Sequence, residues 1–201
     1  DLKPESLLEN APQRSTFGAV AAIYEQVCRA EGKARWGNKS TFMIHHVDAI
    51  LARDPEAKLV WLVRDVRDVA VSSRKSVFSP FHPARTARLW AEQQQEGLAL
   101  EARLEPSQLL RMHYEDLVTE PEAQLRRLCD FLGESFEEPL LDHASTGAAR
   151  KGAKLSESWQ NTGRPILSGN TGKWRAELTA GELESVEAVA GEEMEALGYD
   201  L

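Results

Sequence analysis

The sequence predicts an α/β fold in which helices flank a parallel sheet in three layers. Residues 58–63 form an unbroken apolar run with β-branched side chains, which is typical of a parallel strand buried on both faces. A tight turn and a helix are expected directly after it, at 64–72, and helical patterns separate this strand from a second one expected at 109–113. Strands that alternate with helices indicate a layered α/β fold.

The composition limits the size and class of the protein. With 201 residues, 42% of them hydrophobic, the chain can bury one core but is short for two, so a single domain over residues 1–201 is expected. The formal net charge of −8 argues against a general nucleic-acid-binding surface, so any phosphate site must be local. No run of 18 apolar residues marks a membrane span. Cys28 and Cys129 are expected to be reduced thiols, which fits the cytoplasm.

Periodicity and capping signals give the remaining elements. Apolar residues at helical spacing predict helices at residues 16–30, from 44 to a stop near Asp54 and Pro55, and at 179–198. Thr119 and Thr179 are each followed by Glu three residues later, which indicates two helix starts, and Gly133 is a plausible end for the first of these helices. Residues 145–172, rich in Gly, Ser, Lys and Asn, are interpreted as a long surface loop.

Two side chains beyond the end of the apolar run suggest an anion site. In a parallel sheet, ligands bind beyond the carboxyl ends of the strands, where helix N-termini offer free backbone N–H groups. Arg64 stands at that end, and Ser72 follows Asp65 by two helical turns on the same face, so a phosphate could meet a guanidinium and a hydroxyl together. The spacing also allows an Arg64 that pairs with Asp68 and a Ser72 that faces solvent.

Residues 64–72 read RDVRDVAVS. They resemble the 3′-phosphate-binding segment of sulfotransferases that use 3′-phosphoadenosine 5′-phosphosulfate (PAPS), usually written R-D-P-R-D-x-x-x-S. Val66 replaces the family's proline at a position that only fixes the turn. The resemblance implies a sulfotransferase fold of the P-loop-nucleotide-hydrolase-like type, with Arg64 and Ser72 binding the 3′-phosphate of the donor.

Two further segments resemble the same family. Residues 36–40 read WGNKS and resemble a W-G-x-K-[ST] stretch whose lysine, here Lys39, is implied to neutralise charge on the sulfonate and bridging oxygen during transfer. Residues 114–117 read YEDL and resemble a block whose tyrosine, here Tyr114, lies beside the adenine. The segments at 36–40, 64–72 and 114–117 follow one another in the same order as the family's motifs, which argues against a chance match.

A fourth segment lies late in the chain. Residues 171–175 read TGKWR and resemble the segment in which a loop closes over the donor, which implies donor-binding roles for Gly172, Lys173 and Trp174. Ser158 and Lys173 also stand at spacings similar to those in tyrosylprotein sulfotransferases, where the serine and the lysine contact the donor.

The family's loop for the 5′-phosphosulfate has no counterpart in this sequence. The family opens with a strand and a P-R-S-G-[ST]-[ST] loop, which wraps the phosphosulfate with backbone N–H groups. The nearest string is QRST at 13–16, but no apolar strand precedes it and it stands too close to Trp36. We therefore expect a sulfotransferase domain without its N-terminal strand and loop. The chain is then a piece of a longer polypeptide, which we favour, or a degenerate relative.

The resemblance implies transfer of a sulfonate group from PAPS to a hydroxyl or amine of a small-molecule or peptide acceptor, with release of adenosine 3′,5′-bisphosphate (PAP). The five histidines show no convincing ligand spacing, so no metal site is expected. A non-catalytic nucleotide-binding module is the main alternative, and a P-loop kinase is a weaker one.

The acceptor, the general base and the oligomeric state stay open. His45 and His46 follow Lys39 closely, but neither is assigned as the base. Aromatic residues at 78–82 suggest an apolar wall and slightly favour a flat hydrophobic acceptor over a sugar. Leucines near residue 100 fit either a core or an oligomer interface.

Overall fold

The computed structural model describes residues 16–74, 82–155, 161–167 and 169–201. The chain divides into two compact units, residues 1–43 and residues 44–201. The first unit contains helix α2 (Thr16–Ala30), over the range predicted from the sequence. None of the described helices combines the length and apolar composition needed to cross a membrane.

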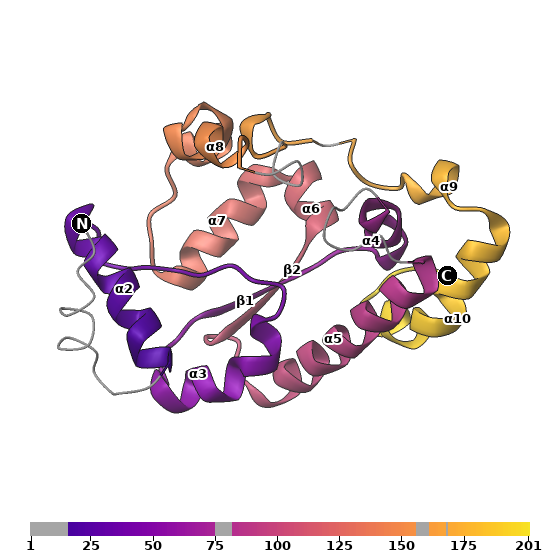
Figure 1. Ribbon diagram of the computed structural model, residues 1–201, viewed down its shortest axis with the longest axis horizontal. Coiled ribbons are helices and arrows are strands. Elements are labelled where there is room, and N and C mark those ends of the chain that lie inside the picture. The colour runs from indigo at the N-terminus through magenta and orange to yellow at the C-terminus, as the bar shows by residue number, and fades with distance from the viewer. Residues whose placement is uncertain (1–15, 75–81, 156–160, 168) are drawn as a thin grey trace. The chain divides into compact units, whose positions relative to one another are not determined.

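Strands and helices alternate from the unit boundary onward. In chain order the elements are η1 (Met43–His46), α3 (Val47–Arg53), β1 (Leu59–Val63), α4 (Val66–Ser73), α5 (Pro83–Arg103), β2 (Leu109–His113), α6 (Tyr114–Thr119), α7 (Pro121–Leu132), η2 (Glu138–Ser145), α8 (Gly147–Gly152), α9 (Trp174–Glu177) and α10 (Ala180–Ala196) (Figure 1). Both predicted strands are present, and so is the helix predicted between them at 64–72.

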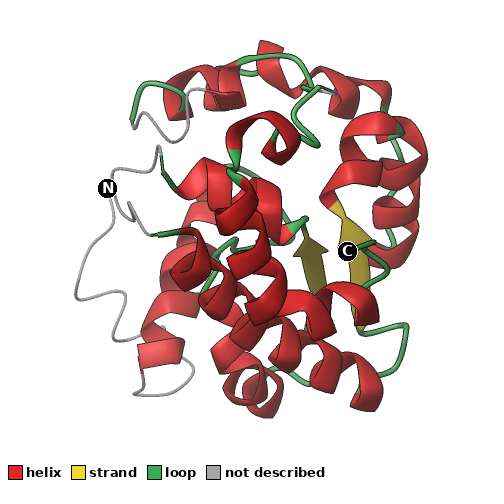
Figure 2. Ribbon diagram, turned by 90° about the vertical axis from the view of Figure 1, so that its right-hand side faces the viewer, coloured by secondary structure: helices red, strands yellow, loops and turns green. Residues whose placement is uncertain are grey.

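The two strands pair in parallel, side by side (Figure 2). The register runs from Leu59 opposite Leu109 to Val63 opposite His113, and the described part of the sheet contains these two strands. Parallel neighbours require a crossover, which α4 and α5 provide. The carboxyl ends of both strands therefore lie together, at Val63 and His113.

One face of the sheet packs against α4, α5 and α10. Trp61 and Val63 point to this face and are buried. The indole N–H of Trp61 donates to Oε1 of Gln94 at 3.0 Å, and its ring lies directly against Gly97 of α5. The core continues through small and apolar residues of the helices, namely Val66, Ala70, Ala87, Trp90, Ala91, Val186, Ala190 and Met194. This packing fixes the carboxyl end of β1 relative to all three helices.

The opposite face of β1 is open. Val60 and Leu62 are 44% and 50% exposed, so the prediction that this strand is buried on both faces is wrong. Their partners in the register, Leu110 and Met112, share that face and are buried. Helix α7 packs against β2, whereas these side chains of β1 stay exposed. An unbroken apolar run thus does not reveal how much of a strand other elements cover.

Two other predictions need correction. Thr119 is not an N-cap, because its hydroxyl donates to the carbonyl oxygen of Glu115 at 2.8 Å, and α7 instead begins with Pro121. Proline suits this position because its missing N–H would have no partner there. Residues 145–172 are not one irregular loop, since they include α8, whose N-cap Thr146 accepts a hydrogen bond from the backbone of the helix.

The capping box predicted for the last helix is present. The hydroxyl of Thr179 accepts the N–H of Glu182 at 3.4 Å, and the Glu182 carboxylate accepts the N–H of Thr179 at 2.9 Å. Arg74 lies 2.5 Å from the other oxygen of that carboxylate. The Thr179 N–H and hydroxyl, and then Arg74, lower the pKa of Glu182 to about 2. The helix ends at Ala196, two residues before Gly198, whose φ is +85°.

Gly97→Ala should destabilise the protein although alanine favours helices. A Cβ atom at Gly97 would lie 2.2 Å from Cζ2 of Trp61, whose indole is held by Gln94. We expect a loss of about 1–3 kcal/mol in the free energy of unfolding by urea denaturation, the usual range for overpacking. Gly181→Ala in α10 is the matched control, since its Cβ would meet nothing within 4 Å. Equal effects of the two substitutions would contradict this packing.

Glu182→Gln should lower stability near pH 7 but not near pH 2. The depressed pKa of Glu182 means that the folded chain stabilises its ionised form relative to the unfolded chain. Its contribution is therefore present above about pH 4.5 and is lost as the pH falls towards 2. Urea denaturation at several pH values should show the gap to the wild type closing over this window. Glu184→Gln, at an exposed position of the same helix, should show no such closing.

Candidate functional site at the end of strand β1

The turn between β1 and α4 is held by side chains from three elements. Asp65 is the N-cap of α4, and its carboxylate accepts the N–H of Arg67 at 2.8 Å. The indole N–H of Trp90 on α5 donates to the carbonyl oxygen of Arg64 at 3.0 Å. The N–H of Asp65 donates to the Glu115 carboxylate of α6 at 3.0 Å. The backbone from Arg64 to Arg67 is thereby fixed before any ligand binds.

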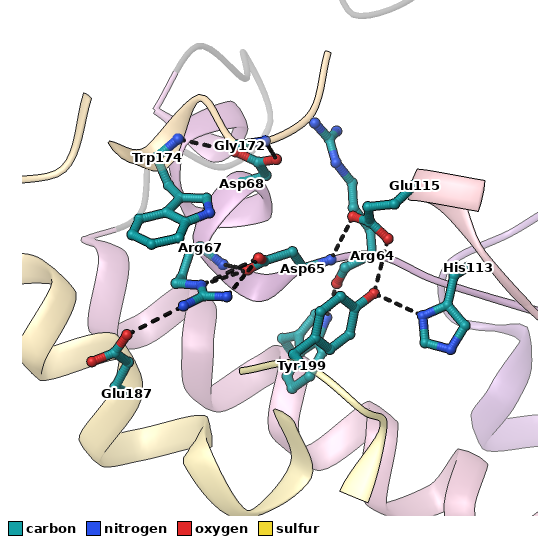
Figure 3. Close-up of polar contacts among 11 residues, drawn as sticks. Arg64, Asp65, Arg67, Asp68, His113, Glu115, Gly172, Trp174, Glu187 and Tyr199 are labelled. Carbon is teal, nitrogen blue, oxygen red and sulfur yellow. Dashed lines mark hydrogen bonds and ion pairs between the residues drawn. The ribbon is translucent and has the colours of Figure 1, made fainter. Parts of the chain in front are cut away.

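The guanidinium of Arg67 is occupied by the protein itself (Figure 3). Its Nε and Nη2 atoms donate to both carboxylate oxygens of Asp65 at 2.9–3.2 Å, and Nη1 lies 3.4 Å from Glu187 of α10. The guanidinium also lies over the ring of Trp174, 4.1 Å from its centroid. Burial alone would lower the pKa of Arg67, but the two carboxylates raise it, so the side chain stays charged. Arg67 is a structural cation.

Arg64 is held differently, and its guanidinium is turned away from that of Arg67 (Figure 3). It lies over the ring of Tyr114, 4.4 Å from the centroid, and Nη2 donates to the carbonyl oxygen of Asn170 at 2.8 Å. The side-chain amide of Asn170 donates in turn to the Tyr114 hydroxyl at 2.7 Å. The Nε atom of Arg64 is buried and has no hydrogen-bond partner among the described residues. This cation therefore keeps unused donor capacity.

The pairing of Arg64 with Asp68 that the spacing allowed does not occur. Asp68 accepts hydrogen bonds from the backbone N–H groups of Gly172 and Trp174 instead, at 2.7 and 3.0 Å. The late segment is thus attached to the first turn of α4. Lys173, between these two residues, has an exposed side chain.

The structure therefore brings several of the predicted site residues together. Arg64, Tyr114, Gly172 and Trp174 lie around the first turn of α4, linked by the contacts above. Ser72 lies on the last turn of the same helix and is exposed. Ser158 and the aromatic residues at 78–81 lie outside the described residues.

The Lys39 segment belongs to the first unit. Trp36 stacks on Tyr24 of α2 with ring centroids 4.7 Å apart, and the side-chain amide of Asn38 donates to the Tyr24 hydroxyl at 2.5 Å. The hydroxyl of Ser40 accepts the backbone N–H of the residue two positions later. Lys39 itself is exposed. Helix α2 thus holds the WGN part of the motif and leaves the lysine side chain in solvent.

The C-terminal segment contacts the site through Tyr199. The hydroxyl of Tyr199 donates to Oε2 of Glu115 at 3.0 Å and lies 3.1 Å from Nδ1 of His113 (Figure 3). Burial, and then the charge of Glu115, raise the pKa of Tyr199, so the phenol stays protonated at neutral pH. Because Glu115 also accepts the N–H of Asp65, the segment after α10 reaches the end of β1 through two hydrogen bonds.

A cavity of about 620 Å³ lies beside the turn, but it does not suit an anion. Its lining residues are Asp65, Arg67, Glu115, Thr171, Gly172, Trp174, Arg175, Leu183, Glu187, Gly198, Tyr199, Asp200 and Leu201. Four of these side chains are carboxylates, and Arg67 is already paired with two of them. Arg64, Ser72 and Tyr114 do not line this cavity, so it is separate from the predicted phosphate site.

Sequence reasoning missed three contributors to the site. Asn170, Trp90 and Tyr199 each reach it from a distant part of the chain. No local motif marks them, and only the Gly- and Asn-rich composition of residues 145–172 pointed to Asn170.

Two findings concern other chemistry. Nδ1 of His45 lies 2.7 Å from a carboxylate oxygen of Glu96 on α5, and both side chains are partly exposed. Within the described ranges, no group of three or more His, Cys, Asp or Glu residues is arranged to hold a metal ion.

Comparison with known proteins links this chain to one family. The model of the Sulfotransferase family matches residues 5–138, about two thirds of the chain. A Caenorhabditis briggsae protein named "Putative protein-tyrosine sulfotransferase" is 24% identical over 131 residues, which make up 62% of this chain and 47% of that protein. The chain thus spans about half the length of this relative.

Solved structures agree on the fold. The sulfotransferase domain from the Synechococcus PCC 7002 olefin synthase has a TM-score of 0.70 at 23% identity, covering 98% of this chain and 74% of that chain. Mouse sulfotransferase SULT7A1, solved in complex with PAP, has a TM-score of 0.50 at 16% identity, covering 72% of this chain and 60% of its own. They confirm the predicted α/β sulfotransferase fold. Since the family model also spans most of the sequence, the chain belongs to the sulfotransferase family.

Proposed function

We propose that this chain carries the 3′-phosphate side of the donor site of a PAPS-dependent sulfotransferase, which transfers a sulfonate group to a hydroxyl or amine of a small-molecule or peptide acceptor. Arg64 and Ser72 bind the 3′-phosphate, Tyr114 lies beside the adenine, and Lys173 contacts the donor from the late segment together with Gly172, Trp174 and Ser158. The product nucleotide is PAP, and no metal takes part. Two free cysteines support a cytoplasmic setting.

The observation that carries the proposal is the state of Arg64. Its guanidinium stands at the carboxyl end of β1, next to the N-terminus of α4, and Nε lacks a partner among the described residues. A buried donor without an acceptor costs about 1–3 kcal/mol, and an anion that accepted a hydrogen bond from this atom would offset that cost. The ring of Tyr114 lies against the same guanidinium. It would offer an aromatic surface to the adenine base of a nucleotide whose 3′-phosphate is bound by Arg64.

Lys39 supplies the charge that the chemistry requires. In the proposed step, the acceptor oxygen or nitrogen attacks the sulfur in line, and the bond from sulfur to the bridging oxygen breaks. The proton of the acceptor passes to a general base or to water, and negative charge develops on the 5′-phosphate of the departing PAP. A positioned ammonium stabilises this charge more in the transition state than in the ground state. The exposed side chain of Lys39, on a motif held by Tyr24, is free to take this role.

We propose further that a segment preceding this sequence carries the loop for the 5′-phosphosulfate. Residues 1–38 contain no string that matches this loop. This observation also favours the second candidate, a non-catalytic module that keeps nucleotide affinity. The two candidates differ in one measurement, since only the enzyme transfers sulfonate when the longer polypeptide receives PAPS and an acceptor.

Arg64→Ala combined with Ser72→Ala should weaken PAP binding by about 100-fold or more, because each hydrogen bond to a charged phosphate contributes about 1.5–3 kcal/mol. Calorimetric titration of this chain and of the longer polypeptide would measure the change. Arg126→Ala removes an exposed arginine of α7 and should leave the affinity unchanged. Equal affinity of the double variant and the wild type, or no binding by the wild-type polypeptide, would contradict the proposed phosphate site.

Lys39→Ala in the longer polypeptide should lower kcat by about 100- to 1,000-fold while PAP affinity changes far less, because the lysine acts on charge that develops during transfer. Steady-state kinetics and PAP titration separate the two effects. Lys33→Ala, another exposed lysine of the first unit, should leave kcat unchanged. A kcat that is insensitive to the loss of Lys39 would remove it from the mechanism.

A further inference from the structure

Asp68 is a buried carboxylate with both of its oxygens used by one backbone segment. It is 1% exposed and lies in the first turn of α4. Its Oδ2 atom accepts the N–H of Gly172 at 2.7 Å, and Oδ1 accepts the N–H of Trp174 at 3.0 Å (Figure 3). A carboxylate is costly to bury unless its oxygens are hydrogen-bonded. These two backbone donors therefore explain how position 68 tolerates an acid.

The conformation of the late segment suits this contact. Gly172 has a φ of +69°, in the left-handed region that glycine adopts at no steric cost. This turn allows the N–H groups two residues apart to converge on the same carboxylate. Lys173 lies between them, so its backbone is fixed on both sides while its side chain stays exposed. The contact determines where the Lys173 ammonium can reach.

Three residues at the start of α4 and just before it hold this segment, each in a different way. Arg64 donates to the carbonyl oxygen of Asn170, and Arg67 lies over the ring of Trp174. Of these three, only Asp68 grips the backbone on both sides of Lys173. The start of α4 therefore fixes the conformation of residues 170–174, and Asp68 makes the largest number of hydrogen bonds to their backbone.

We propose that Asp68 is a positioning residue, which holds residues 172–174 so that Lys173 is presented to the nucleotide donor. The identity of the ligand rests on the function proposed above, whereas the hold on the backbone does not. Asp68 does not touch the donor in this proposal, because both of its oxygens are used by backbone N–H groups. It links the phosphate site on α4 to the segment that covers the same nucleotide.

Asp68→Asn tests the hold on the backbone without any ligand. Asparagine keeps the size of the side chain, but its NH₂ group cannot accept a hydrogen bond, so one backbone N–H loses its acceptor. Trypsin cleaves after Lys and Arg, and Lys173 and Arg175 are both exposed. We expect cleavage after Lys173, identified by mass spectrometry, to become about tenfold faster or more, following the loss of a charge-assisted hydrogen bond.

The control is Val186→Ala, which truncates a fully buried side chain of the core in α10 and so lowers overall stability by another route. Urea denaturation would place the two variants on one stability scale. Faster cleavage after Lys173 in Asp68→Asn than in Val186→Ala at equal stability supports the proposal. Equal cleavage rates would overturn it, since the segment would then open only through global unfolding.

A double-mutant cycle tests whether Asp68 acts through Lys173. In the wild-type background, Asp68→Asn should weaken PAP binding by about tenfold, and in the Lys173→Ala background by less than about twofold, because the group being positioned is gone. Full additivity would overturn the positioning role. If the wild-type polypeptide does not bind PAP, the proposed function fails, and the protease experiment alone decides whether Asp68 holds the segment.

Discussion

The buried ion pair between Asp65 and Arg67 is the interaction on which the site depends. Removing one partner of such a pair typically costs about 3–5 kcal/mol, because an uncompensated charge stays buried. Here the pair also connects elements: Asp65 caps α4, and Arg67 reaches Glu187 of α10 and the ring of Trp174. The end of the sheet, the last long helix and the late segment therefore share one charged centre, and they are expected to lose their order together.

This centre also separates the roles of two arginines that the sequence places three residues apart. Arg67 has two carboxylates and an aromatic ring around its guanidinium, so its charge is already balanced within the protein. Arg64 has a ring, a backbone carbonyl and a spare donor. The two aspartates also have different roles: Asp65 caps its own helix, whereas Asp68 accepts hydrogen bonds from the distant residues Gly172 and Trp174.

Local signals in the sequence predicted most of the elements, because caps and periodicity act over a few residues. The capping box at Thr179 and the strand at 109–113 are examples. The prediction that β1 is buried on both faces was wrong, because burial of the second face depends on where α7 packs. The motifs pointed to Arg64 and Tyr114, whose side chains are in contact. They could not identify Asn170, whose contact with Arg64 spans 106 positions, or Trp90 on the crossover helix. Such links exist only in the folded chain.

The electrostatics support the proposal that Arg64 binds the phosphate in an otherwise acidic protein. The chain carries a formal net charge of −8, and four carboxylates line the cavity beside the turn, so these surroundings repel an anion more than they attract one. Among the described residues no carboxylate forms an ion pair with Arg64, and the ring of Tyr114 lies against it without neutralising its charge. A guanidinium kept free of acids in such surroundings, at the carboxyl end of a parallel strand, has the charge and the place that a nucleotide phosphate requires.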